Sequence, residues 1–306
     1  MSNILVTGSS GLIGRPLRAQ LRQQGHHVTG IDLLGIGADQ GDIRDRSVID
    51  RVVAGCDGII HLAAVSRVAW GQRDPERCWS TNVGALENLL AATDIGAAAP
   101  WIVFASSREV YGHAASLPVS EDSPLEPVNV YARSKVEGER LMTSALQRGR
   151  RGAIVRFSNV YGSVLDHADR VVPAFARAAA SGEPIRVDGS RNTFDFTFVD
   201  DVVGGLLTLV RQINEDRAIL PPIHFVSGEP TTLGELAALA QQIAGNTCTV
   251  QEAPPRDFDV AHFIGDPERA RTLLGWQSTV GIREGLARLI ADFRAEQARA
   301  AISTAS

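Results

Sequence analysis

A glycine-rich stretch near the start of the chain restricts the possible fold more than any other feature. Residues 6–14 read VTGSSGLIG, so Gly8, Gly11 and Gly14 follow the apolar run 4–6 at a spacing of three. Because glycine has no Cβ, a bulky group can approach the main chain closely here. Where such a loop joins a strand to a helix, the first helical amides favour an anion such as a pyrophosphate. The alternative is an ordinary tight turn.

Short apolar runs alternate with helical patterns through the first half of the chain. Each run is bounded by turn residues and is too short for a core helix, which indicates a buried parallel strand. The runs are 4–7, 28–32, 58–62, 101–105 and 153–157, and 223–226 has the pattern of a further strand. This alternation predicts an α/β fold with a doubly wound parallel sheet of the Rossmann type.

The second half of the chain has a more mixed pattern, punctuated by prolines. We expect residues 1–157 to form the sheet domain and 201–226 to return to it. Residues 158–200 and 227–294 then form a smaller substrate lobe that is discontinuous in sequence. The apolar stripe within 233–243 is expected to pack into a core. Residues 295–306, rich in Ala, Ser, Thr and Arg, are expected to form a loose tail.

Composition excludes several classes of function. The formal net charge of -5 gives no general attraction to nucleic acid or to anionic membranes, and no run of about 18 apolar residues is long enough to span a bilayer. The three cysteines are scattered and lack metal-ligand spacing, so we expect reduced thiols and no metal site. No signal peptide is evident at the N-terminus. Together these features predict a cytoplasmic protein.

Asp32 is a candidate cofactor residue at the end of the second expected strand. It follows Gly11 by 21 residues, where a carboxylate can accept hydrogen bonds from an adenosine ribose diol and would repel a 2'-phosphate. The next residues, 33–35, contain no arginine to reverse that preference. The sequence therefore favours NAD over NADP, the alternative for Asp32 being a carboxylate in a strand-end turn.

The chain resembles the extended short-chain dehydrogenase/reductases of the nucleotide-sugar epimerase and dehydratase branch. The resemblance runs from about residue 3 to 276 and rests on TGSSGLIG at 7–14, Asp-Ile at 42–43 and HLAA at 61–64. In that family these segments hold the dinucleotide, and an asparagine further along supports the site. The resemblance implies NAD contacts from Gly8, Gly11, Leu12, Ile13, Gly14, Asp32, Asp42, Ile43, Leu62, Ala63, Ala64, Asn82, Tyr131 and Lys135.

Tyr131 and Lys135 are candidate catalytic residues. Their spacing of four places the phenol and the ammonium on one face of a helix. Lys135, together with a positive nicotinamide ring, would favour the phenolate and make Tyr131 a proton acceptor. The same spacing occurs on many solvated helices, but here it follows a strand-end serine and a dinucleotide loop. By resemblance, Ser107 hydrogen-bonds the reacting sugar oxygen and completes a triad.

The implied chemistry is removal of a proton from a sugar hydroxyl while hydride leaves the same carbon, which gives a transient ketone. An epimerase then returns the hydride to the opposite face, with no net redox change. Dehydratases of the family carry Asp-Glu where this chain has Arg108 and Glu109. Arginine does not donate a proton at neutral pH, which argues against dehydration. Glu109 either takes part in catalysis, as in family decarboxylases, or braces the loop.

Substrate contacts also follow from the resemblance. Asn159, in RFSNVYG, and Arg256 match family residues near the substrate diphosphate, and Val172 lies in a segment expected to cover the nucleotide. The family usually has an arginine where this chain has Phe194, and Arg191 is a candidate replacement or a solvated turn residue.

The leading hypothesis is an NAD-dependent 4-epimerase of a nucleotide sugar, with a UDP-hexose as substrate. The alternatives are a nucleotide-sugar decarboxylase or dehydratase, a ketosugar reductase and, from another class, an NAD-sensing scaffold without chemistry. By resemblance we also expect a homodimer formed through helices that contain 87–90 and 136–141, with neither nucleic acid nor membrane as a partner.

Overall fold

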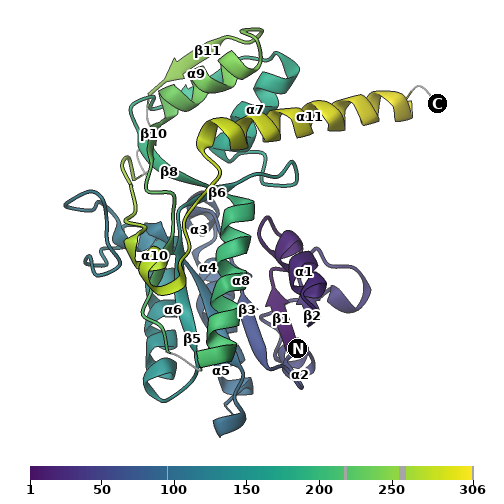
Figure 1. The fold of residues 1–306 in the computed structure, drawn as a ribbon, viewed down its shortest axis with the longest axis vertical. Coiled ribbons are helices and arrows are strands. Elements are labelled where there is room, and N and C mark those ends of the chain that lie inside the picture. The colour runs from purple at the N-terminus through teal and green to yellow at the C-terminus, as the bar shows by residue number, and fades with distance from the viewer. Residues whose placement is uncertain (95, 217–218, 255–259, 305–306) are drawn as a thin grey trace.

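A computed structural model of the protein describes residues 1–94, 96–216, 219–254 and 260–304 (Figure 1). Its larger part contains a six-stranded sheet in the order β2-β1-β3-β4-β5-β9, and every neighbouring pair is parallel. The strands are β1 (Asn3–Thr7), β2 (His27–Ile31), β3 (Gly58–His61), β4 (Trp101–Ser107), β5 (Gly152–Phe157) and β9 (Ile223–Phe225). The predicted doubly wound α/β sheet is confirmed, and each predicted apolar run supplies one strand.

The strand order reverses beside β1, which lies between β2 and β3. In open parallel sheets, ligands bind beyond the carboxyl ends of the strands at the point where the order reverses. The glycine stretch 8–14 leaves the carboxyl end of β1 and enters α1 (Gly14–Gln23). The fold therefore places this stretch where a dinucleotide is expected.

Helices cover both faces of the sheet. Clusters of buried apolar side chains show α1 and α8 (Val199–Asp216) on one face, with α2 (Arg46–Val53), α5 (Ala85–Ala92) and α6 (Val130–Gln147) on the other. The remaining helices of this part are α3 (Val68–Arg73), α4 (Pro75–Trp79), the single π-turn η2 (Ser80–Gly84), α10 (Glu268–Leu274) and the short 3-10 turns η1 (Gly37–Asp39), η3 (Gly96–Ala98) and η4 (Arg108–Tyr111).

The central strand β4 shows why the strand sequences are apolar throughout. Val103 and Ala105 pack into the cluster beneath α8, whereas Ile102 and Phe104 pack into the cluster beneath α5 and α6. Successive side chains of a strand point to opposite faces, so a sheet covered on both sides needs continuous apolar runs.

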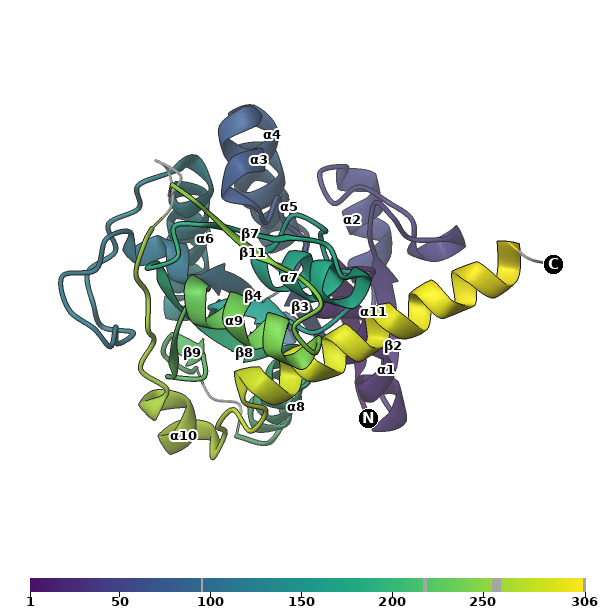
Figure 2. The same ribbon diagram turned by 90° about the horizontal axis from the view of Figure 1, so that it is seen from above.

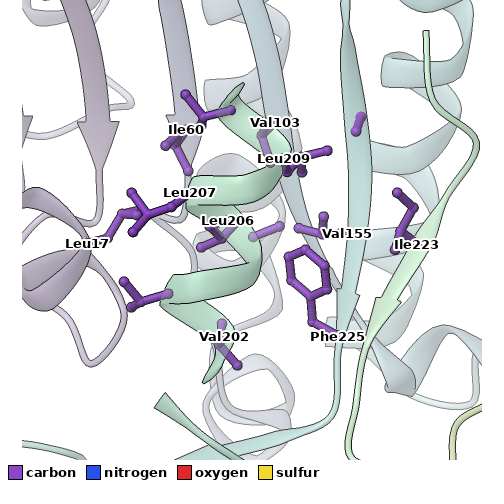
Figure 3. Close-up of a cluster of buried hydrophobic side chains, with 14 of the residues drawn as sticks. Leu17, Ile60, Val103, Val155, Val202, Leu206, Leu207, Leu209, Ile223 and Phe225 are labelled. Carbon is purple, nitrogen blue, oxygen red and sulfur yellow. The ribbon is translucent and has the colours of Figure 1, made fainter. Parts of the chain in front are cut away.

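The long helix α8 returns the chain to the sheet after the first part of the smaller lobe. Figure 3 shows Val202 and Leu206 of α8 packed toward Val155 and Phe225 of the sheet, and all four are buried. Burying each such side chain contributes about 1.5–3 kcal/mol. This packing fixes α8 on the sheet and places β8, which directly precedes it, above the carboxyl ends of the strands (Figure 1).

The smaller part carries two short sheets and three helices above the carboxyl ends of the large sheet (Figure 1). Its own core includes Tyr161, Phe175, Leu236 and Leu289. The elements are β6 (Asn159–Tyr161), β8 (Thr193–Phe198) and β10 (Pro230–Thr232) in one sheet, β7 (Ile185–Asp188) and β11 (Val250–Ala253) in the other, and the helices α7 (Val171–Ser181), α9 (Leu233–Ile243) and α11 (Ile282–Thr304).

Two details of the predicted division are wrong. Ala270, Leu274 and Trp276, which the sequence analysis put in the smaller lobe, pack into the core beneath α8. Residues 295–304, expected as a loose tail, continue helix α11, and its end projects from the molecule (Figure 2). The bias toward Ala and Arg in this segment is that of a good helix former, so composition alone did not separate an exposed helix from a tail.

Among the helices that the structure describes, none has both the length and the apolar character needed to cross a bilayer.

Candidate active site

The glycine loop has the close main-chain approaches that the sequence predicts. Gly8 has φ +69°, and a Cβ on it would lie 2.7 Å from the amide nitrogen of Ala63. A Cβ on Gly14 would lie 2.2 Å from the carbonyl oxygen of Gly8, whereas one on Gly11 would meet that oxygen at 3.3 Å. Gly8 and Gly14 therefore need to be glycine, and the loop presents bare backbone at the carboxyl end of β1.

The first turn of α1 fits an anion. Ile13 precedes the helix and supplies no side-chain cap, and no acidic residue lies in the first turn. The side chains of Leu12 and Ile13 pack against the core beneath α8, which anchors the loop. The Arg15 amide already donates to the Gly11 carbonyl oxygen, and Pro16 has no N–H. The partial positive charge of the helix start still suits a pyrophosphate.

Asp32 lies beside this loop at the end of β2. Its carboxylate accepts hydrogen bonds from the amides of Ser10 at 3.0 Å and Leu34 at 2.8 Å. These bonds hold the carboxylate beside the glycine loop, where the sequence predicts the adenosine ribose. The remaining lone pairs of the two oxygens suit a diol.

Asp42 and Ile43, predicted to lie beside the adenine, have other local contacts as well. Arg44 Nη2 donates to Asp42 Oδ2 at 2.5 Å, and this hydrogen bond lowers the pKa of the Asp42 carboxyl. The Ile43 side chain is buried in the core beneath α5 and α6. Adenine contact by these residues stays a prediction, and for Ile43 only the backbone remains available for it.

The HLAA segment meets the glycine loop. The amide of Ala63 donates to Thr7 Oγ1 at 3.2 Å, and the backbone of Leu62 and Ala63 lies against Gly8. Ala64 follows directly and is partly buried. The structure thus brings two segments more than 50 residues apart in sequence to the same edge of the sheet.

Asn82 supports the site from η2. It is 1% exposed, accepts from the Val65 amide at 2.8 Å and donates to Ser134 Oγ at 2.9 Å. Ser134 Oγ donates in turn to the carbonyl oxygen of Tyr131 at 2.7 Å. Asn82 therefore connects the loop after β3 to the helix that carries Tyr131 and Lys135.

Ser107, Tyr131 and Lys135 come together at the carboxyl end of β4. The Ser107 side chain lies close enough to Tyr131 to lower the pKa of the phenol, and Lys135 Nζ lies 5.9 Å from the centre of the Tyr131 ring. Lys135 Nζ also donates to the carbonyl oxygen of Ala105 at 2.8 Å. Ser107 ends the fully buried β4, so strand and helix fix all three groups.

The predicted effect of Lys135 together with a nicotinamide on Tyr131 stays a prediction, and the chain's own groups leave the pKa of Tyr131 raised. Burial of the phenol is the largest effect and raises the pKa of Tyr131 to about 12. The negative charge of Glu109 acts in the same direction, whereas Ser107 and the positive charge of Arg170 lower the pKa. Burial lowers the pKa of Lys135 to about 8. Activation of the phenol therefore depends on further positive charge, which a bound nicotinamide would supply.

Glu109 is held between two partners. Its Oε1 lies 2.9 Å from Arg108 Nη2, and its Oε2 accepts from Asn129 Nδ2 at 3.1 Å. Asn129 also caps α6, because its Oδ1 accepts from the Ala132 amide at 2.8 Å. The sequence analysis missed Asn129, although an asparagine two residues before Tyr131 is a recognisable helix-capping signal.

The other predicted substrate residues that the structure describes lie in several separate segments of the smaller part. Asn159 is partly buried at the start of β6, whereas Val172 is 2% exposed in the core of the smaller part, which leaves its backbone for any contact. Arg191 is exposed in a turn before β8. Arg256 lies outside the described residues, so its role stays a prediction. In the described ranges, no group of three or more His, Cys, Asp or Glu side chains could hold a metal ion.

Arg170, which the sequence analysis did not select, also acts on the site. Its positive charge lowers the pKa of Tyr131, and its Nε lies 3.5 Å from Asp166 Oδ1. Arg170 precedes α7 in the smaller part, so sequence spacing alone gave no sign that it lies near a residue of α6.

Comparisons with known proteins identify the family of the chain. The model of the "NAD dependent epimerase/dehydratase family" matches residues 4–221. UDP-glucuronic acid decarboxylase 1 of Danio rerio is 30% identical over 312 residues, which cover 96% of this chain and 73% of the relative. UDP-glucose 4-epimerase of Mycolicibacterium smegmatis is 30% identical over 313 residues, which cover 95% and 98%.

The fold is also similar to a solved structure. The crystal structure of UDP-glucose 4-epimerase with UDP-glucose from Thermotoga maritima superposes with a TM-score of 0.88 at 28% identity. The match covers 96% of this chain and 99% of that one. The similarity therefore includes both the large sheet and the smaller part.

Proposed function

Because the chain belongs to the NAD-dependent epimerase/dehydratase family, we propose that it is a nucleotide-sugar 4-epimerase that transiently oxidises C4 of a UDP-hexose. Its membership makes it an NAD-dependent enzyme that modifies nucleotide sugars. The relatives divide at this similarity between a 4-epimerase and a decarboxylase, so the proposal rests on the site.

The observation that carries the proposal is the joined set of Ser107, Tyr131 and Lys135. The serine lies close enough to lower the pKa of the phenol, and the ammonium lies 5.9 Å from the phenol ring centre. An NAD-sensing scaffold has no use for a buried phenol, a hydroxyl and an ammonium held together. The arrangement supports an enzyme.

We derive the roles of these residues from their positions. Ser107 can donate to the C4 oxygen of the sugar and hold it against Tyr131, which accepts the C4 hydroxyl proton. Lys135 supplies positive charge beside the phenol and is itself held by the Ala105 carbonyl. When bound, NAD supplies the acceptor for the C4 hydride and the source of its return. Tyr131 then gives the proton back to the new hydroxyl group.

Dehydration has little support in the site. The position of the family acid holds Arg108, whose guanidinium keeps its protons at neutral pH. A second candidate is decarboxylation of a UDP-linked uronic acid, favoured by Glu109, which is 8% exposed and acts electrostatically on Tyr131. Release of carbon dioxide from such a substrate would identify this reaction, and net consumption of reduced cofactor would identify a ketosugar reductase.

The first test is a product analysis. Purified protein is incubated with UDP-, dTDP-, GDP- and CDP-sugars, and mass spectrometry with chromatographic separation of epimers identifies the products. We expect interconversion of C4 epimers of a UDP-sugar with no change in mass.

The matched variant is Tyr131→Phe, which removes only the phenol oxygen. We expect turnover to fall by at least about 10²-fold, since the proton acceptor is lost, while NAD remains bound. Full activity of this variant would remove the proposed mechanism.

We also expect a homodimer formed through α5 and α6, which sedimentation equilibrium can measure.

A further inference from the structure

Arg108 is the first residue of η4 and directly follows Ser107. Its side chain is 11% exposed, and Nη2 is engaged with Glu109 Oε1 at 2.9 Å. The guanidinium carbon lies 4.8 Å from the centre of the Phe194 ring and 5.7 Å from that of Phe263. The cation is therefore held in a fixed place between the large sheet and β8.

Within this environment, Arg108 Nη1 is buried and has no hydrogen-bond partner in the described part of the chain. A buried donor of a charged group that makes no hydrogen bond is costly, and such groups in folded proteins usually meet water or a ligand. Phe194 and Phe263 offer only ring faces. The unused donor therefore calls for a polar group that arrives with a ligand.

The position of Arg108 indicates which part of a nucleotide sugar it would contact. Ser107, its neighbour, and Glu109, its ion-pair partner, both act on the pKa of the Tyr131 phenol. Arg108 thus belongs to the part of the site that surrounds the reacting carbon. A group that reaches its Nη1 is a substituent on the sugar ring, since the diphosphate lies at the other end of the sugar.

Charges of both signs surround the phenol. Arg170 lowers and Glu109 raises the pKa of Tyr131 through their charges, and the Lys135 ammonium lies 5.9 Å from the centre of the phenol ring. A bound nicotinamide would add one more positive charge.

We propose that Arg108 binds a carboxylate on the sugar ring, so that the preferred substrate of the proposed epimerase is a nucleotide-linked hexuronic acid. A guanidinium suits a carboxylate because its donors are planar and permanently charged. The proposal deepens the proposed function and rests on it for the position of the sugar.

The test compares binding of three probes to the NAD-loaded protein by isothermal titration calorimetry. The probes are UDP-glucuronic acid, UDP-glucose and UDP. We expect the wild type to bind the acid more tightly than the neutral sugar. Arg108→Met is expected to weaken binding of the acid by roughly 10- to 100-fold and to leave the two other probes within about twofold, since only the acid loses a charge-assisted contact.

Two further variants keep the result interpretable. Arg186→Met is the matched control, because Arg186 lies in β7 with a side chain that is 74% exposed and pairs with Asp188. We expect no change with any probe. Arg108→Lys retains the charge but loses the planar donors, and we expect an intermediate loss for the acid. Unchanged affinity for UDP shows that each variant is folded.

Equal losses for all three probes with Arg108→Met would place Arg108 at the diphosphate and overturn the inference. So would a wild type that binds the acid no better than UDP-glucose. The two proposals also fail separately. C4 epimerisation of a neutral hexose, unaffected by Arg108→Met, would leave the proposed function standing alone. Acid binding that depends on Arg108 without any C4 epimer would leave the inference standing alone.

Discussion

At the scale of single residues, Glu109 has two possible roles, one in holding the loop and one in the chemistry. Its carboxylate is shared between Arg108 and Asn129, which fits a residue that braces the loop, yet its charge also raises the pKa of Tyr131. The same group can therefore affect the rate without touching the substrate.

We predict that Glu109→Gln lowers the pKa of Tyr131 and moves the rising limb of the pH-rate profile to lower pH, by up to about one unit. The direction follows because the variant removes a negative charge that disfavours the phenolate. Initial rates between about pH 6 and 9 measure the shift. A large loss of turnover at every pH would instead make Glu109 a direct participant in the chemistry.

Among the elements, the glycine loop leaves no room for a side chain at Gly14. We predict that Gly14→Ala abolishes NAD binding and destabilises the fold by about 1–3 kcal/mol, because its Cβ would lie 2.2 Å from the Gly8 oxygen. The control is Gly204→Ala in α8, where a Cβ would meet nothing within 4 Å. That change is expected to stabilise by about 0.5–1 kcal/mol. Urea unfolding and NAD titration measure both effects.

The start of α8 is a second point where one side chain supports several elements. Asp201 accepts hydrogen bonds from Ser278 Oγ at 2.9 Å, from the Thr279 amide at 3.0 Å and Oγ1 at 2.7 Å, and from the Val280 amide at 2.9 Å. These bonds attach the segment before α11 to α8.

We predict that Asp201→Ala lowers the free energy of unfolding by about 3 kcal/mol, since several donors lose a charged acceptor. Asp200→Ala is the neighbouring control, because the Asp200 side chain is 57% exposed and lies 3.9 Å from Arg288. It is expected to change stability by less than about 1 kcal/mol. A similar loss in both variants, measured by urea unfolding, would contradict this role for Asp201.

The sequence predicts features that depend on neighbouring residues better than contacts between distant segments. The sheet follows from local apolar runs, and the joined triad follows from Tyr131, Lys135 and a strand-end serine in order. Contacts between distant segments leave no local pattern, which is why Arg170 and the stacking of Arg108 on Phe194 were not foreseen. For the same reason, the apolar face of α10 did not reveal which of two cores it joins.

For the whole molecule, two buried histidines predict sensitivity to mild acid. Burial, as the largest cause, lowers the pKa of both His61 and His224 to about 3. The unfolded chain binds protons at these side chains near pH 6.5, whereas the folded chain does not, so stability is lost as the pH falls below 6.5.

We predict that the free energy of unfolding falls by roughly 2 kcal/mol between pH 7 and pH 5.5 from these two groups together. Urea unfolding at the two pH values measures the change. The variant His61→Gln is expected to retain about half of this pH dependence. A stability that stays constant over this interval in the wild type would show that the histidines titrate normally.

The fixed attachment of the triad has a consequence for the substrate. Ser107 ends a strand buried on both faces, and Lys135 ties α6 to that strand through the Ala105 carbonyl. Inversion at C4 requires the two faces of the oxidised carbon to be presented in turn to the same hydride donor. In the proposed epimerase the protein groups cannot exchange places, so the oxidised sugar would have to rotate about the bonds that link it to the phosphates. The clearance around that rotation will then decide which ring substituents the enzyme tolerates.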